Sequence, residues 1–152
     1  MERGTLVADF ELADETGSGR RLSELLSDGP LVLFFYPAAG SRGCSAEARH
    51  FRDLAADFTA VGAQVVGIST DRVAKQQKFA EGCSLGFPLL SDTQGTVAKE
   101  FGVKRRFGPI PVKRWTFVIG RDRRVLELIK SETNMRVHAD RALAALRALP
   151  HS

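Results

Sequence analysis

The sequence predicts an α/β fold in which a central mixed β-sheet is flanked by helices and preceded by an N-terminal β-hairpin. Two short, continuous apolar runs, residues 31–36 and 64–69, have the length and composition of strands buried on both faces. Segments that favour helices follow both runs, so strands and helices alternate along the chain. The chain has 152 residues, 43% of them hydrophobic, which is enough for a substantial core. We therefore expect residues 1–152 to form a single domain.

The first elements are a hairpin and a long helix. Residues 10–12 and 20–22 flank the turn-rich segment DETGSG, and this pattern predicts two short paired strands. After the strand at 31–36, apolar residues recur at steps of three and four from Ser45 onward: Ala48, Phe51, Ala55 and Phe58. This spacing predicts a helix with one apolar face.

The middle of the chain continues the alternation. After the strand at 64–69, Asp71 is expected to cap a helix that continues to about Glu81, and Gly82 is expected to end it. A short strand near residues 89–90 and a helix over about 96–101 come next.

The last third of the chain predicts a second hairpin and a terminal helix. Residues 115–119 and 125–129 are apolar runs on either side of the turn GRDRR. The segment HADRALAALRAL consists largely of strong helix formers. The resulting order, βαβαβαββα, predicts a mixed sheet covered by helices.

Cys44 lies where the strand at 31–36 passes into the helix, after a loop that contains Pro37, Gly40 and Gly43. Unpaired backbone amides and the helix dipole favour negative charge in the first turn of a helix. A thiolate at this position would be stabilised and nucleophilic. The alternative is a buried, unreactive thiol, which is a common environment for a free cysteine.

Pro37, Ser41 and Cys44 form the pattern P-x-x-x-S-x-x-C, which resembles the active-site motif of the peroxiredoxins. Glu47 and the segments VVGISTD, FPLLSD, FGV and KRWTFVIG extend the resemblance over nearly the whole chain, and together they are similar to the bacterioferritin-comigratory, or PrxQ, subfamily. The resemblance implies a thioredoxin-like fold and a thiol-dependent peroxidase that reduces hydrogen peroxide and organic hydroperoxides. It also implies a thioredoxin-like reductant, no metal, haem or flavin cofactor, and a monomer, with a weak dimer as the alternative.

The resemblance assigns roles to single residues. Cys44 is the expected peroxidatic cysteine, while Ser41 and Arg114 are expected to bind and activate the peroxide. The alternative for Ser41 is a helix N-cap, and the two roles are compatible. Arg114 would also stabilise the thiolate, although a surface arginine is the alternative. Pro37 is expected to shape and shield the loop, and Glu47 to orient Arg114, unless it is simply a carboxylate on the helix surface.

Cys83, the other of two cysteines, is the candidate resolving cysteine. Many PrxQ-type proteins carry that cysteine five residues after the peroxidatic one, where this chain has Arg49. Another variant carries it in the later helix, about one turn before Cys83. We expect a Cys44–Cys83 disulfide, which requires local unfolding if the two sulfurs lie apart. The alternative is a one-cysteine cycle in which an external thiol resolves the sulfenic acid.

A second departure from the subfamily pattern is Arg42, which stands where proline is usual. The formal net charge is +4, and eight basic residues gather in the second half of the chain: Lys104, Arg105, Arg106, Lys113, Arg114, Arg121, Arg123 and Arg124. This cluster matches no nucleic-acid-binding motif, so we predict a solvated basic face without a nucleic-acid partner. Arg42 and this face could steer anionic partners toward the site.

Several other functions find no support in the sequence. A dithiol oxidoreductase needs C-x-x-C, and Ser41 occupies the first position of that motif. The cysteines and histidines show no metal-ligand spacing: Cys44, Cys83, His50, His138 and His151. The N-terminal segment lacks the apolar core of a secretory signal, and no apolar run is long enough to span a membrane, so a cytoplasmic location is expected. A redox-controlled binding or holdase module stays as the non-enzymatic alternative.

Overall fold

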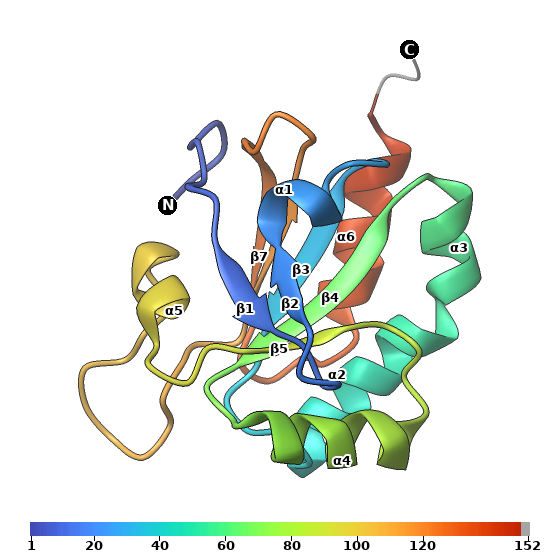
Figure 1. Cartoon of the computed structure of the whole chain (residues 1–152). Helices are drawn as coiled ribbons and strands as arrows, with labels where there is room; N and C mark the ends of the chain where they lie inside the picture. Colours follow the sequence, from blue (N-terminus) through green and yellow to red (C-terminus); the bar gives the residue numbers. More distant parts are fainter. Residues whose placement is uncertain (150–152) are drawn as a thin grey trace.

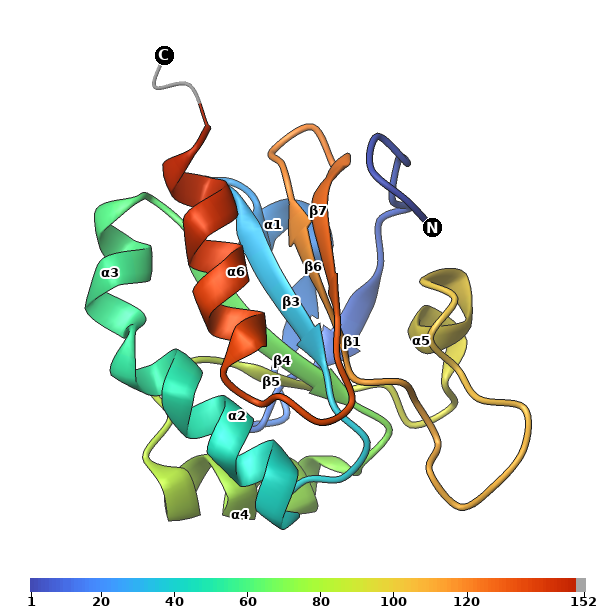
Figure 2. The same ribbon diagram turned by 180° about the vertical axis from the view of Figure 1, so that it is seen from behind.

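A computed structural model describes residues 1–149, which contain a seven-stranded mixed sheet with helices on both faces (Figures 1 and 2). The strand order is β2-β1-β5-β4-β3-β6-β7. The strands are β1 (Glu11–Ala13), β2 (Gly19–Arg21), β3 (Leu31–Phe35), β4 (Gln64–Ser69), β5 (Leu89–Ser91), β6 (Trp115–Ile119) and β7 (Val125–Lys130). Parallel pairing joins β3, β4 and β5, and antiparallel pairing adds β6 and β7 on one side and the β1–β2 hairpin on the other. The predicted α/β class, mixed sheet and N-terminal hairpin are confirmed.

The helices divide between the two faces of the sheet. They are α1 (Leu22–Leu25), α2 (Arg42–Asp53), α3 (Ala55–Ala60), α4 (Val73–Cys83), α5 (Thr96–Glu100) and α6 (Val137–Arg147). Apolar side chains of α2, α3, α4 and α6 share one core cluster, and those of α1 and α5 share the other. Among the described residues, no helix is both long and apolar enough to cross a membrane.

The apolar run of β3 is explained by burial on both faces. Successive side chains of a strand point to opposite faces, and Phe34 and Phe35 enter different core clusters. Phe34 stacks on Phe51 of α2, with ring centroids 4.4 Å apart, whereas Phe35 packs against Phe101 at 5.2 Å. This central strand carries the chain directly into the loop before Cys44.

Two helix boundaries differ from the sequence prediction. The helix predicted from Ser45 begins earlier, at Arg42, and is interrupted at Leu54, so that α2 and α3 are separate helices. Both Phe51 and Phe58 still face the core, with ring centroids 5.9 Å apart. The short helix α1 was not predicted, because its four residues are too few to show a helical period.

The predicted ends of α4 are wrong for local reasons. Asp71 does not cap the helix, because its carboxylate accepts hydrogen bonds from the backbone of Ala39 and the hydroxyl of Ser69. Gly82 does not end the helix either. The helix continues to Cys83, and Ser84 takes the left-handed conformation (φ 50°, ψ 51°) that closes it.

Candidate active site

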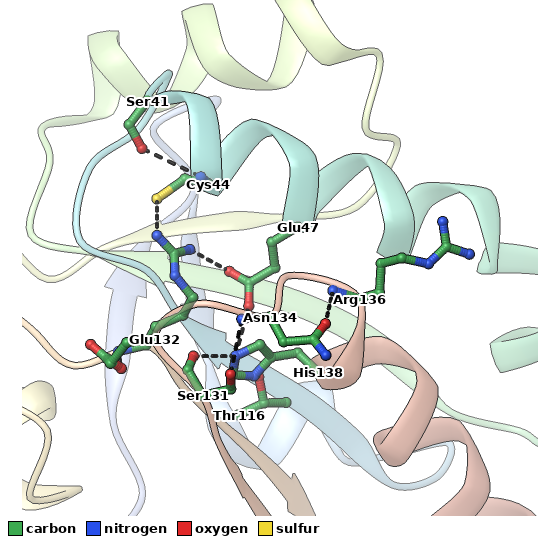
Figure 3. Close-up of polar contacts among 10 residues, drawn as sticks. Ser41, Cys44, Glu47, Thr116, Ser131, Glu132, Asn134, Arg136 and His138 are labelled. Atoms are coloured by element: carbon green, nitrogen blue, oxygen red, sulfur yellow. Dashed lines mark hydrogen bonds and ion pairs between the residues drawn. The ribbon is translucent and has the colours of Figure 1, made fainter.

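Cys44 is the third residue of α2 and is fully buried. Ser41 is the N-cap, and its hydroxyl oxygen accepts a hydrogen bond from the Cys44 backbone N–H at 3.4 Å. Figure 3 shows both side chains at the start of this helix, with Glu47 one turn further on. The thiol therefore lies at the positive end of a twelve-residue helix, as the sequence predicts.

A buried polar network holds the loop between β3 and α2. The backbone N–H of Ala39 donates to Asp71 Oδ2 at 2.7 Å, and the Ser69 hydroxyl donates to the same oxygen at 2.8 Å. The Gln76 amide donates to Ser69 Oγ at 2.9 Å, while its oxygen accepts from the Tyr36 hydroxyl at 2.5 Å. The loop that contains Pro37 is thus tied to α4 through Tyr36 and to the turn between β4 and α4 through Ala39.

Arg114 lies directly before β6, 70 residues after Cys44 in the sequence, and its side chain contacts the Cys44 sulfur. Its guanidinium donates to Cys44 Sγ at 3.3 Å through Nη2 and to Glu47 Oε1 at 2.9 Å through Nη1. Arg114 is 7% exposed, so the surface alternative for this arginine is wrong. Burial alone would lower the pKa of Arg114, but the Glu47 carboxylate and the Cys44 sulfur hold it above its ordinary value. The site therefore keeps one buried positive charge beside the sulfur.

Gly43 leaves the space that the guanidinium occupies. A Cβ atom built at this position would lie 3.3 Å from Arg114 Nη2 and 3.6 Å from Met135 Sδ. The 3.3 Å contact requires the guanidinium to move by a few tenths of an ångström, whereas 3.6 Å is an ordinary contact. A side chain at position 43 would therefore displace Arg114 from its place beside the sulfur.

The backbone of Arg114 is held by a residue that the sequence reasoning missed. Glu132, in the segment after β7, accepts from the Arg114 backbone N–H at 2.8 Å and from the Arg105 guanidinium at 2.8 Å. The Ser131 N–H adds a longer bond, 3.4 Å, to the Arg114 carbonyl. No motif marks Glu132, because its partner is a main-chain group far away in the sequence.

Glu47 lies behind Arg114 and is fully buried, so the alternative of a surface carboxylate is wrong. Its Oε2 atom is buried without a hydrogen-bond partner. His138 Nε2 lies 3.5 Å from this oxygen, and Figure 3 shows the Glu47 carboxylate directed toward the histidine. Burial raises the pKa of Glu47 to about 8, against the opposing effect of the Arg114 charge.

Cys83 does not meet Cys44 in this structure. Both are free, buried cysteines, and Cys83 is the last residue of α4. The Arg52 guanidinium donates to the Cys83 carbonyl oxygen at 2.6 Å, which fixes this end of α4 beside the last turn of α2. Because Arg52 follows Cys44 by eight residues, its Cα lies about 12 Å further along the helix axis. The structure thus brings together Ser41, Cys44, Glu47 and Arg114, with Cys83 outside the group.

The remaining candidates lie at the margin of the site. Arg42 is the first residue of α2 and is exposed, and its effect on anionic partners stays a prediction. Within residues 1–149, no group of three or more His, Cys, Asp or Glu side chains is placed to hold a metal ion. His151 lies outside the described residues.

A helix-terminal cysteine under a buried arginine, on a mixed sheet of this order, defines a thiol-dependent peroxidase, and comparison with known proteins gives the family. The AhpC/TSA family model matches residues 4–128, and the chain belongs to this family. The crystal structure of peroxidoxin BcpB from Mycobacterium tuberculosis is similar over 99% of both chains, with 62% identity and a TM-score of 0.96. Rice peroxiredoxin Q is 34% identical over 98% of this chain and 68% of its own.

A third relative is the bacterioferritin comigratory protein of Xanthomonas campestris, described for its alkyl peroxide reduction activity. It is 28% identical, with a TM-score of 0.83 over 91% of this chain and 90% of its own. The predicted thioredoxin-like fold, the PrxQ-type resemblance and the assignment as a peroxidase are confirmed.

Proposed function

We propose that this peroxiredoxin reduces hydrogen peroxide and organic hydroperoxides through Cys44, with Ser41 and Arg114 as the groups that bind the peroxide. The observation that carries the proposal is the Arg114 guanidinium, which lies 3.3 Å from the Cys44 sulfur inside a buried site. A fixed cation at this distance stabilises a thiolate and can also donate to peroxide oxygens. The alkyl peroxide reduction activity described for the Xanthomonas campestris relative supports alkyl hydroperoxides as substrates.

In the first step the Cys44 thiolate attacks the terminal peroxide oxygen. The S–O bond forms as the O–O bond breaks, so the sulfur loses two electrons and the peroxide gains them. The alkoxide or hydroxide that leaves takes up a proton and departs as alcohol or water. In this proposal Arg114, which contacts the Cys44 sulfur, and the Ser41 hydroxyl at the helix N-cap hydrogen-bond the peroxide oxygens, and Pro37 shapes the loop before Cys44.

In the second step the Cys83 thiol attacks the sulfur of the Cys44 sulfenic acid, which forms a disulfide and releases water. Cys83 lies at the helix end that Arg52 holds, so this step requires the last turn of α4 to open. A thioredoxin-like dithiol then reduces the disulfide and returns both thiols. The competing cycle uses an external thiol, and the separation of the two cysteines in this conformation is the observation that favours it.

We propose that the cycle runs in the cytoplasm, where thioredoxin-type reductants keep thiols reduced and can recycle the disulfide. A monomer remains the prediction for the oligomeric state.

The test is mass and thiol analysis of wild type, Cys44→Ser and Cys83→Ser after one equivalent of peroxide, together with peroxide consumption in the presence of thioredoxin. We expect wild type to lose two hydrogens in a Cys44–Cys83 disulfide, and Cys83→Ser to stop at the sulfenic acid. A wild type that stops at sulfenic acid would favour the external thiol. Unoxidised Cys44 would contradict its proposed role.

A further inference from the structure

His138, in the first turn of α6, is fully buried and lies behind Glu47. Its Nε2 atom is 2.8 Å from the Ser131 carbonyl oxygen and 3.5 Å from Glu47 Oε2. On the other side of the ring, Nδ1 is 2.8 Å from the Thr116 hydroxyl. The imidazole is thus held between a strand of the central sheet, the segment after β7 and the helix that carries Cys44 (Figure 3).

These partners determine the tautomer of the ring. A carbonyl oxygen only accepts hydrogen bonds, so the proton must lie on Nε2, which faces the Ser131 carbonyl. Nδ1 then accepts from the Thr116 hydroxyl. Burial lowers the pKa of His138, which keeps the ring neutral with this single N–H. That N–H donates to the Ser131 carbonyl, and Nε2 also lies 3.5 Å from Glu47 Oε2, a buried oxygen without a hydrogen-bond partner.

We propose that His138 is a positioning residue for peroxide reduction: its Nε2–H holds Glu47, and Glu47 in turn holds the Arg114 guanidinium against the Cys44 sulfur. The proposal rests on the peroxidase chemistry assigned above to Cys44. Its basis is a continuous buried chain of contacts, at 3.5 Å, 2.9 Å and 3.3 Å, from His138 to the sulfur. Without His138, the second carboxylate oxygen would face only the protein interior, and Glu47 could turn away from Arg114.

Hydrogen bonds within the segment before α6 fix the position of His138. The Asn134 side-chain oxygen accepts from the backbone N–H groups of Arg136 and Val137, both at 3.2 Å, and the Ser131 hydroxyl accepts from the Asn134 N–H at 3.0 Å. The same turn supplies the Ser131 carbonyl to His138. One short segment therefore positions the ring and, through Glu132, the backbone of Arg114.

Three charged groups act on His138 from the elements around it: Arg114 before β6, Glu132 after β7 and Arg141 on α6. Glu47 itself is acted on by Arg114 and Glu132. A change at His138 should consequently alter the pH at which the Cys44 thiolate becomes reactive. A residue that only fills space would not have this effect.

The test compares two amides that imitate different halves of the imidazole. His138→Gln can place an amide N–H near the Nε2 position, whereas His138→Asn reaches only the Nδ1 position and leaves Glu47 without its donor. His50→Asn is the matched control, because His50 pairs with Asp140 at 2.7 Å outside the site. All variants are made with Cys83→Ser, so that Cys44 is the single thiol.

Three quantities are measured: the rate constant for hydrogen peroxide, the rate of Cys44 alkylation as a function of pH, and the free energy of unfolding in urea. We expect His138→Asn to lower the peroxide rate constant about 10-fold, in the range of couplings between neighbouring residues, and to move the alkylation profile to higher pH. His138→Gln should keep most of the wild-type peroxide rate constant and a nearly wild-type alkylation profile. His50→Asn should change neither quantity. In a Glu47→Gln background, His138→Asn should have no further effect.

The proposal would be overturned if His138→Asn and His138→Gln lowered the peroxide rate constant equally and in proportion to their loss of unfolding free energy. An unchanged alkylation profile in His138→Asn would also overturn it. If His138→Asn does not fold, Thr116→Val removes the hydroxyl that orients the ring at nearly constant volume. It should shift the profile in the same direction by a smaller amount, and an unchanged profile again overturns the proposal. The alkylation measurement needs no peroxide, so it decides the role of His138 even if the protein reduces no peroxide.

Discussion

Arg52→Ala should accelerate formation of the Cys44–Cys83 disulfide, because Arg52 holds closed the helix end that carries Cys83. Its guanidinium donates to the Cys83 carbonyl oxygen at 2.6 Å. A hydrogen bond to a charged group contributes roughly 1.5–3 kcal/mol when buried. The Arg52 side chain is 35% exposed, so we take about 1 kcal/mol after discounting for solvent screening. A loss of that size raises the open population of the α4 end about 5-fold.

The assay follows intact mass after rapid mixing with one equivalent of peroxide and acid quench at successive times. Sulfenic acid formation should keep the wild-type rate, since Arg52 touches neither Cys44 nor Arg114, whereas its conversion to disulfide should be about 5-fold faster. Arg49→Ala is the control, because Arg49 is an exposed arginine on the same helix. An unchanged or slower conversion in Arg52→Ala would refute the reasoning. Absence of a disulfide in wild type would instead refute the role of Cys83.

Three further predictions concern Arg114 and its neighbours. Arg114→Lys keeps the charge but cannot contact Cys44 and Glu47 together, so peroxide consumption should slow roughly 100-fold; a loss below 3-fold would contradict this. Gly43→Val should slow peroxide consumption about 10-fold, because the new side chain displaces the Arg114 guanidinium. Ala46→Val, at an exposed position of the same helix, should leave the rate of peroxide consumption unchanged. Native Glu47 has its pKa raised to about 8, so it retains a proton that the unfolded chain releases. The free energy of unfolding should therefore fall as the pH rises from about 4.5 to 8. Urea titrations of Glu47→Gln should show a weaker dependence of this free energy on pH. The same pH dependence in both proteins would exclude the raised pKa.

The sequence reveals the elements of this fold well where local chemistry determines them. β4 was predicted residue for residue, and the strand before Cys44 to within one residue, because a run buried on both faces is continuously apolar. Cys44 and Ser41 could also be predicted together, since a helix start is a local feature and the cap lies three residues from the thiol. Gly43 was seen only as a loop residue, although its missing side chain makes room for Arg114.

Features that depend on distant partners were beyond local patterns. Asp71 has the sequence of a helix cap, yet it binds the backbone of Ala39, from the loop before Cys44. His138 stands in a sequence that reads only as a good helix, and its relation to Glu47 arises when α6 packs beside α2. Such contacts need the register of the whole sheet, which no single segment specifies.

The hydrogen bonds of α4 also indicate how much of the helix must open for the proposed disulfide. Gln76 is fixed to Tyr36, Ser69 and the Leu90 carbonyl, so the first turn stays attached to the base of the Cys44 loop. Beyond Gln76, the seven residues to Cys83 span about 10 Å as helix and up to about 23 Å when extended. The segment after Cys83 borders a surface pocket of about 200 Å³, but Leu85 is buried in the core cluster, so the opening must also release this side chain. Unwinding from Gln76 onward would lengthen the reach of Cys83 by up to about 13 Å, while the loop that holds the thiolate stays in place.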